Sequence, residues 1–316
     1  MTKPENIVLV VGSLHHDIVV EADHLPRKDE TAVGTRWFPK FGGKGGNQAV
    51  SAQRHGASVR MVGAVGADGF GRFLLDRLAA SGVDCQFVVT CPDVGSGMSV
   101  AIMDPGGDYA ATIVSGANLR IAPAALGDAA VWQGARLLIL QNEIPEPVNI
   151  AAATEARRRG IRTLLNAAPS RPMSPEFTRA VDILVVNAVE AEMMGCDPVT
   201  TLLQAEDAAR LLADRFETVI VTAGAAGLAA WSAEDEHFTI PAEPIKVVSS
   251  HGAGDAFIGA LAAAITRGDA FKIACAAASH AAAEHVAGRA PGRAALEASP
   301  VPPKTSLRQA RSAKDC

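Results

Sequence analysis

The sequence lacks the features that mark several large classes of protein. Its five cysteines are odd in number and form no Cys-x-x-Cys pair, which argues against a disulfide framework or a zinc knuckle and favours reduced thiols. The apolar run near its start, Ile7–Val11, has five residues, too few for a signal-peptide core or a membrane span. Basic residues do not exceed acidic ones, since 29 Lys and Arg stand against 34 Asp and Glu. We therefore expect a cytoplasmic protein that binds neither nucleic acid nor membrane.

Apolar residues are plentiful, at 48% of the chain, so a large core is available. Short apolar runs alternate with helical patterns through most of the length. We predict buried strands at Ile7–Val11, Ser58–Val62, Leu137–Leu140, Arg162–Leu165, Ile183–Val186 and Val219–Thr222. We predict helices at Gly45–Arg54, Arg72–Ala80, Pro147–Arg159 and Gln204–Asp214. This alternation is typical of a parallel sheet covered by helices on both faces, with a ligand crevice at the carboxyl ends of the strands.

Two regions break the alternation. Ile18–Val20 and Thr31–Phe38 have strand-like composition with no helix between them. Ser96–Asp104 and Tyr109–Val114 read as a hairpin around the turn-rich Asp104–Asp108. We predict that these pieces form a small sheet that projects as a lid; edge strands of the main sheet are the alternative.

The domain prediction follows from these patterns. We expect a single α/β domain over residues 1–290 with a discontinuous lid at about 15–40 and 95–117. Residues 291–316 contain Pro, Ser, Arg and Lys without apolar periodicity, and we predict a partly ordered tail.

The segment Ser-His-Gly-Ala-Gly-Asp-Ala-Phe at residues 250–257 carries the strongest chemical signal, because a helical pattern follows it. Backbone N–H groups of Gly252–Gly254 at a helix start would converge on one point, where the helix dipole favours an anion. Asp255, in the first helical turn, would stay ionised and could accept a proton from an alcohol. That combination suits phosphoryl transfer. An N-capping Asp after a glycine turn is the alternative.

A second glycine-rich segment, Gly-Gly-Lys-Gly-Gly-Asn-Gln-Ala at residues 42–49, places Lys44 and Asn47 at the mouth of a predicted helix. It is not a Walker A loop, because the spacing GxxxxGK[ST] is absent. The segment Val11–Asp17 contains one glycine and is no dinucleotide fingerprint. A flexible turn is the alternative for the glycine-rich segment.

These two segments, about 200 residues apart, resemble the two signature regions of the ribokinase-like (PfkB) carbohydrate kinases. Further matching segments are Val11–Ser13 with Asp17, Phe41–Asn47, Gly116–Asn118, Gln141–Glu143, Asn166–Pro169, Asn187–Glu192, Thr222–Gly227 and Gly252–Asp255. The resemblance covers roughly residues 6 to 290. It implies a ribokinase-like three-layer α/β sandwich with a mostly parallel central sheet and a small β-sheet lid. It also implies a homodimer that uses ATP and Mg²⁺ to phosphorylate a hydroxyl of ribose or a similar pentose or hexose.

The resemblance assigns roles residue by residue. For catalysis it implies Asp255 as the base and Gly252, Ala253 and Gly254 as the anion hole. For the sugar it implies His15, Asp17, Gly43, Lys44, Asn47 and Glu143 together with Asp255. For the nucleotide it implies Asn187, Thr222, Gly224, Gly227, Gly254 and His280. Glu190 would order Mg²⁺ through water. A capped helix start at Asn187 and a packed core position for His280 are the alternatives that the residues themselves leave open.

The sequence also departs from the family pattern. The family's Asp that helps to bind an activating potassium ion is Ser249 here, so the resemblance predicts weak or absent potassium activation. The segment Gly288–Gly292, which would complete that ion site, matches poorly. His15 replaces an Asn and changes the donors of the sugar pocket. The substrate therefore stays open among ribose, fructose, a ketodeoxy sugar acid and a nucleoside, and a non-catalytic sugar-binding protein is the further alternative. A sugar acid would need a cation, for which Lys44 is the candidate.

Overall fold

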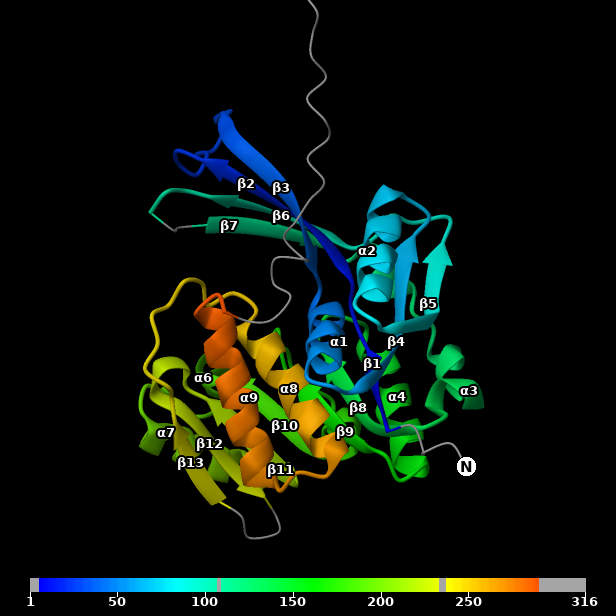
Figure 1. The fold of residues 1–316 in the computed structure, drawn as a ribbon, viewed down its shortest axis with the longest axis vertical. Coiled ribbons are helices and arrows are strands. Elements are labelled where there is room, and N and C mark those ends of the chain that lie inside the picture. Colours follow the sequence, from blue (N-terminus) through cyan, green and yellow to red (C-terminus); the bar gives the residue numbers. More distant parts are fainter. Residues whose placement is uncertain (1–5, 107–108, 233–236, 290–316) are drawn as a thin grey trace, which may run out of the picture.

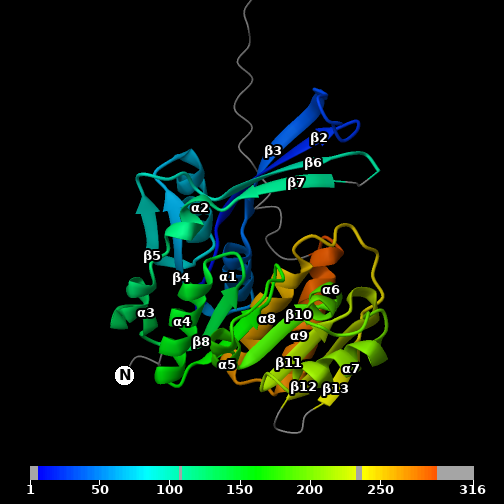
Figure 2. The same ribbon diagram turned by 180° about the vertical axis from the view of Figure 1, so that it is seen from behind.

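The computed structural model describes residues 6–106, 109–232 and 237–289. Its main sheet has nine strands in the order β13-β12-β11-β10-β9-β8-β1-β4-β5 (Figures 1 and 2). They are β1 (Ile7–Val11), β4 (Ser58–Gly66), β5 (Asp84–Cys91), β8 (Ala135–Gln141), β9 (Arg162–Asn166), β10 (Ile183–Asn187), β11 (Thr218–Thr222), β12 (Gly227–Ser232) and β13 (His237–Pro241). The strands from β11 to β5 pair in parallel, while β12 and β13 pair antiparallel at one edge. The six buried strands predicted from the sequence are all present in this sheet.

Helices cover both faces of the sheet. They are α1 (Lys44–Arg54), α2 (Gly69–Ala80), α3 (Ala129–Trp132), α4 (Glu146–Arg158), α5 (Pro175–Ala180), α6 (Ala188–Met193), α7 (Leu202–Leu212), α8 (Ala253–Arg267) and α9 (Phe271–Val286). Figure 1 shows α1, α8 and α9 in front of the sheet, and Figure 2 shows α4, α6 and α7 in front of the other face. In the part of the chain that the structure describes, no helix is long and apolar enough to cross a membrane.

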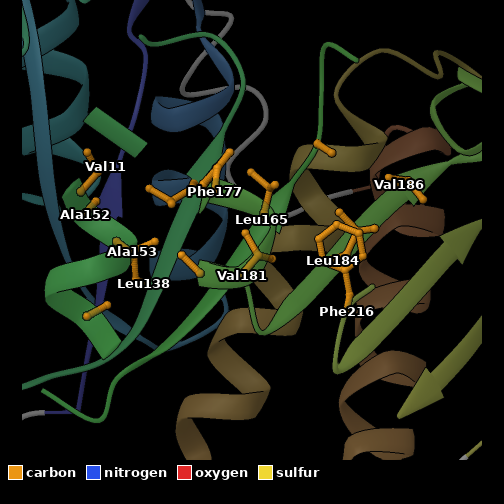
Figure 3. Packing of buried hydrophobic residues seen from close by; sticks show 14 of the residues in the cluster. Val11, Leu138, Ala152, Ala153, Leu165, Phe177, Val181, Leu184, Val186 and Phe216 are labelled. Atoms are coloured by element: carbon orange, nitrogen blue, oxygen red, sulfur yellow. The ribbon is translucent and has the colours of Figure 1, made fainter. Parts of the chain in front are cut away.

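Alternate residues of the central strands enter two separate cores. Leu9 and Val11 of β1 join a cluster with α4, α5 and α7, part of which Figure 3 shows. Val8 and Val10 join a second cluster with α1, α8 and α9. Each of these four side chains is fully buried, which is why β1 reads as one continuous apolar run. The result is the predicted three-layer arrangement.

The helices α1 and α8 approach each other closely in the layer that Figure 1 shows in front. A Cβ atom added at Gly259 of α8 would lie 2.3 Å from the Cβ atom of Ser51 of α1, so this position admits no larger residue without movement. Ser51 Oγ also donates a hydrogen bond of 3.0 Å to the Ala256 carbonyl. Ser51 lies one helical turn after Asn47, and Ala256 directly follows Asp255. The contact therefore brings predicted site residues of the two helices close together.

A second sheet of four strands projects from the body (Figures 1 and 2). Its order is β3-β2-β6-β7, from β2 (His15–Ala22), β3 (Gly34–Gly42), β6 (Met98–Met103) and β7 (Tyr109–Val114). These are the segments predicted to leave the main sheet, although β3 begins at Gly34 and not at Thr31. The edge-strand alternative is wrong, because none of these described strands pairs with the main sheet. The predicted turn Asp104–Asp108 lies partly, and the predicted tail 291–316 wholly, outside the described residues.

Candidate active site

The glycine-rich loop before α1 packs against the backbone that follows β1. Gly43, the N-cap of α1, has φ +86°, and an added Cβ atom there would lie 2.7 Å from the His15 nitrogen. A Cβ atom added at Gly45 would lie 2.6 Å from the Ser13 nitrogen. These glycines are therefore required for a close backbone contact, so the flexible-turn alternative is wrong. The contact fixes the two segments that carry most of the predicted sugar-binding residues.

Asp255 lies in the first turn of α8, and helix α1 holds its carboxylate. Oδ1 accepts a hydrogen bond from Gln48 Nε2 (2.9 Å) and Oδ2 accepts one from Asn47 Nδ2 (3.1 Å). The N-cap of α8 is Gly252, so the alternative in which Asp255 caps the helix is wrong. Burial raises the pKa of Asp255 from 3.8 to about 6, and the charge of Glu143 adds to the rise, whereas Lys44 and the two amides oppose it.

Gly252 and Gly254 leave space at the start of α8. Gly252 has φ +83°, a left-handed conformation that favours glycine. A Cβ atom added at Gly254 would meet no described atom within 4 Å. The Ala253 N–H donates a long hydrogen bond of 3.3 Å to the Ser250 carbonyl. The helix start thus combines N–H groups without intrahelical partners with room for a ligand beside Asp255.

The predicted sugar residues form a connected group near Asp255. Glu143 Oε2 accepts hydrogen bonds from Ser13 Oγ and from the Lys44 backbone N–H (2.8 Å), and it lies 4.0 Å from His15 Nδ1. The structure thus brings together residues that are about 100 or more positions apart in the sequence. His15 is buried, at 4% exposure, which places an imidazole inside the predicted pocket.

Asp17 begins the projecting sheet and is held from both sides. Its neighbour Ser99 on β6 donates a hydrogen bond of 2.5 Å to Oδ1, and Lys40 is its partner on β3. Burial raises the pKa of Asp17, while the Ser99 hydrogen bond and the charges of His15 and Lys40 oppose that rise. A Cβ atom added at Gly42 would lie 2.0 Å from Asp17 Oδ2, so a larger residue there would displace this carboxylate.

The predicted nucleotide residues gather at the ends of β10 and β11. Asn187 pairs with Thr222 across these strands. Asn187 also caps α6, because its side chain accepts from Glu190 N–H and Glu190 Oε2 accepts from Asn187 N–H, both at 2.9 Å. The capped-helix alternative is therefore correct, and it is compatible with the predicted role. Burial raises the pKa of Glu190, and the charge of Lys44 opposes that rise.

The other predicted nucleotide residues are Gly224, Gly227 and His280. Gly224 (φ +54°) and Gly227 (φ +116°) bracket a short 3₁₀ turn, and an added Cβ atom at Gly227 would lie 2.1 Å from the Ile240 carbonyl oxygen. His280 Nδ1 lies 2.8 Å from Glu243 Oε1, and 61% of the His280 side chain is exposed. The core alternative for His280 is therefore wrong.

A Mg²⁺ ion would find one carboxylate here. Among the described residues, no group of three or more His, Cys, Asp and Glu could hold a metal ion. Glu190 alone therefore fits an ion that keeps several waters and is held mainly by phosphate oxygens.

A cavity of about 470 Å³ opens beside Asp255 and Gly252 between α1 and α9. His280 lines it, but Asn187, Glu190 and Thr222 do not. His251 also lines it, and burial together with the positive charges of Lys40, Lys44 and His285 lowers the pKa of His251 to about 4. His251 is therefore neutral at pH 7, and Lys40 and Lys44 supply the positive charge near it.

Sequence reasoning missed several members of the site. They are Ser13, Lys40, Gln48, Ser99 and His285, each of which contacts or faces a predicted residue. The pairing of Ser99 and Lys40 with Asp17 follows from the order of strands in the small sheet. Gln48 could have been found from the sequence, because it follows Asn47 in the first turn of the predicted helix.

Comparisons with known proteins identify the family of the chain. The profile of the pfkB family of carbohydrate kinases matches residues 6–297. A ribokinase of Mus musculus is 38% identical over 259 residues, which cover 81% of this chain and 80% of that protein. A ribokinase of Bacillus subtilis is 34% identical over 262 residues, which cover 83% of this chain and 86% of that protein. The structure of an Arabidopsis thaliana ribokinase complexed with ribose and ATP has a TM-score of 0.82 at 27% identity, covering 89% of this chain and 92% of that one.

Proposed function

The chain belongs to the pfkB family of carbohydrate kinases, and on that premise we propose that it transfers the γ-phosphoryl group of ATP to a hydroxyl of ribose or a similar pentose or hexose. One observation carries the proposal. Asp255 is buried at the start of α8, beside the Gly252–Gly254 segment, and its carboxylate is held by Asn47 and Gln48 of the other glycine-rich segment. The two segments that stand out in the sequence therefore meet at one carboxylate.

Asp255 acts as the general base in this proposal. With a pKa of about 6 it is mostly ionised at pH 7, yet basic enough to accept the proton of a sugar hydroxyl. The two amide donors fix the direction of its oxygens. Gly252, Ala253 and Gly254 offer backbone N–H groups to the transferring phosphoryl group, so that its charge is balanced where it develops.

Lys44 connects the two halves of the site. Its positive charge opposes the rise in the pKa of Asp255 on the sugar side and of Glu190 on the nucleotide side. An ammonium group between these carboxylates can neutralise charge on a phosphate that passes from one side to the other.

The substrates have separate sets of residues. The residues that would hold the sugar are His15, Asp17, Gly43, Lys44, Asn47, Glu143 and Asp255. Asn187, Thr222, Gly224, Gly227 and His280 would hold ATP, and Glu190 would hold Mg²⁺ through water. When bound, ATP supplies the phosphoryl group and Mg²⁺ neutralises its oxygens. Among the alternative substrates, a sugar acid would need a cation near the sugar position. Lys40 is a candidate beside Lys44, because its charge opposes the rise in the pKa of Asp17.

We propose a role for the small sheet as well. It would close over the sugar as a lid that comprises about residues 15–40 and 95–117, within a single domain over residues 1–290. The same sheet would form the contact between the two subunits of a homodimer. Exposed apolar side chains support a contact, since Trp37 is 65% and Ile113 58% exposed. Sedimentation at micromolar concentration tests this: we expect a dimer that Trp37→Ser weakens, and a wild-type monomer would contradict it.

ATP turnover against a panel of acceptors tests the proposed function. The panel comprises ribose, 2-deoxyribose, fructose, a ketodeoxy sugar acid and a nucleoside, with ATP alone as the baseline. We expect turnover above baseline with ribose or another sugar of the panel, and loss of that turnover in Asp255→Asn. Sugar binding without turnover on any acceptor would instead identify a non-catalytic sugar-binding protein.

A further inference from the structure

The loop before α8 is held against the end of α9. The backbone N–H groups of Val248 and Ser249 both donate to the Val286 carbonyl, at 2.9 and 3.2 Å. The side chain of His285 reaches the same loop, with Nε2 at 2.9 Å from the His251 carbonyl oxygen. A carbonyl oxygen only accepts, so Nε2 must carry the hydrogen.

The His285 contact fixes one peptide unit of the anion hole. The His251 carbonyl and the Gly252 N–H belong to the same planar peptide unit and point in opposite directions. A donor that holds the carbonyl on one side therefore fixes the direction of the Gly252 N–H on the other. The ring also lies directly against Gly252, because a Cβ atom added there would be 3.0 Å from His285 Nε2.

Gly252 needs such a restraint. It is the N-cap of α8 in a left-handed conformation, and glycine has more backbone freedom than any other residue. The described structure gives α8 no side-chain hydrogen bond at its N-cap. Donors that stabilise a transition state act best when they are already in position before the reaction.

We propose that His285 is a positioning residue for phosphoryl transfer, which holds the His251–Gly252 peptide unit so that the Gly252 N–H stays directed at the transferring phosphoryl group. The inference rests on the proposed function.

Two nearly isosteric variants separate the hydrogen bond from the volume of the side chain. His285→Gln can place an N–H donor near the His251 carbonyl, whereas His285→Met fills similar space without a donor. His237→Met is the control, because the His237 ring stacks on Trp231 (5.1 Å between ring centroids) on the edge strand β13 and does not line the cavity beside Asp255. The readouts are kcat and KM on the best acceptor, thermal unfolding, and the affinities for ADP with and without fluoroaluminate, a mimic of the transferring phosphoryl group.

We expect His285→Met to lower kcat by about tenfold to a hundredfold, less than the loss seen when a donor is removed outright. The KM for the sugar and the affinity for ADP alone should change less than about twofold, while binding of ADP with fluoroaluminate weakens by a factor similar to that in kcat. His285→Gln should recover most of the loss, and His237→Met should behave as the wild type.

The outcomes that would contradict the inference can be told apart from those that would contradict the proposed function. A wild-type kcat in His285→Met overturns the inference and leaves the proposed function intact. Equal losses in the Gln and Met variants, accompanied by equal losses of thermal stability, also overturn it, because they would indicate packing alone. Absence of wild-type turnover on every acceptor would overturn the proposed function and, with it, the inference.

Discussion

The substitution Asp255→Asn is expected to stabilise the protein at neutral pH while it removes most of the activity. Asp255 is 8% exposed, and its burial raises the pKa from 3.8 to about 6. The folded state therefore binds the proton more tightly than the unfolded state does. The wild type loses stability as the pH rises from 3.8 to about 6, whereas the neutral Asn variant does not.

The magnitude follows from the rise in pKa. About 1.4 kcal/mol for each of about two pH units gives about 3 kcal/mol at pH 8. A second effect opposes it, because Asn47 and Gln48 both donate to Asp255, and an amide can accept from only one of them without a clash of hydrogens. That loss is about 1–2 kcal/mol and does not depend on pH. The difference in unfolding free energy between the variant and the wild type should therefore increase by about 2–3 kcal/mol from pH 4 to pH 8. At pH 8 the variant should be more stable by about 1–2 kcal/mol, which is the gain of about 3 kcal/mol less the lost hydrogen bond.

Urea unfolding of both proteins across this pH range measures the difference. Asp207→Asn is the control, because the Asp207 side chain is 64% exposed, and the variant should show no such trend. In parallel, kcat should fall by about 10²-fold in Asp255→Asn, and the kcat/KM of the wild type should fall as the pH drops through about 6. A stability difference that stays constant from pH 4 to pH 8 would refute the reasoning, because it would mean that the carboxylate is not destabilised by burial.

Three further predictions concern the sugar side and the cation. Ser99→Ala removes a donor to Asp17, so the KM for the sugar should rise by about tenfold or more with ADP affinity unchanged; an unaltered KM would separate Asp17 from the sugar. Sugar should slow hydrogen exchange in residues 18–38 and 96–114, if the small sheet closes over it, and equal exchange with and without an accepted sugar would exclude a lid. Initial rates in potassium and in a large organic cation at matched ionic strength should differ little, because Ser249 carries no charge; stimulation of about tenfold or more by potassium would contradict this.

The parts of the fold that the sequence predicted share one physical property. The strands β1 and β8 to β11 lie inside the sheet with both faces covered, so they appear as unbroken apolar runs. The strand β5 was missed because it lies at an edge and is only partly buried, with polar residues such as Gln86 among its apolar ones. The antiparallel pair β12 and β13 was missed because its pattern differs from the strand–helix alternation of the rest.

The site divides in the same way. Asp255 and Asn47 lie in short glycine-rich segments that can be recognised in the sequence. In the structure, Asn47 donates a hydrogen bond to Asp255. Ser99 and His285 have no local signal. Ser99 reaches Asp17 through the pairing of β6 with β2, and His285 reaches its carbonyl through the end of α9. Such contacts depend on which elements become neighbours in the fold.

The close contact of α1 with α8 has a consequence for biosynthesis. Ser51 is made in the first fifth of the chain, while Gly259 and Ala256 come about 200 residues later. The ribosome thus releases β1 and α1 long before their partners α8 and α9 exist. The part of this sheet face that α8 and α9 cover remains exposed until then. A chain that terminates before α8 would therefore be a poorly protected fragment that depends on chaperones. Premature stops before the codon for Ala253 should accordingly lower the amount of protein as well as abolish its catalysis.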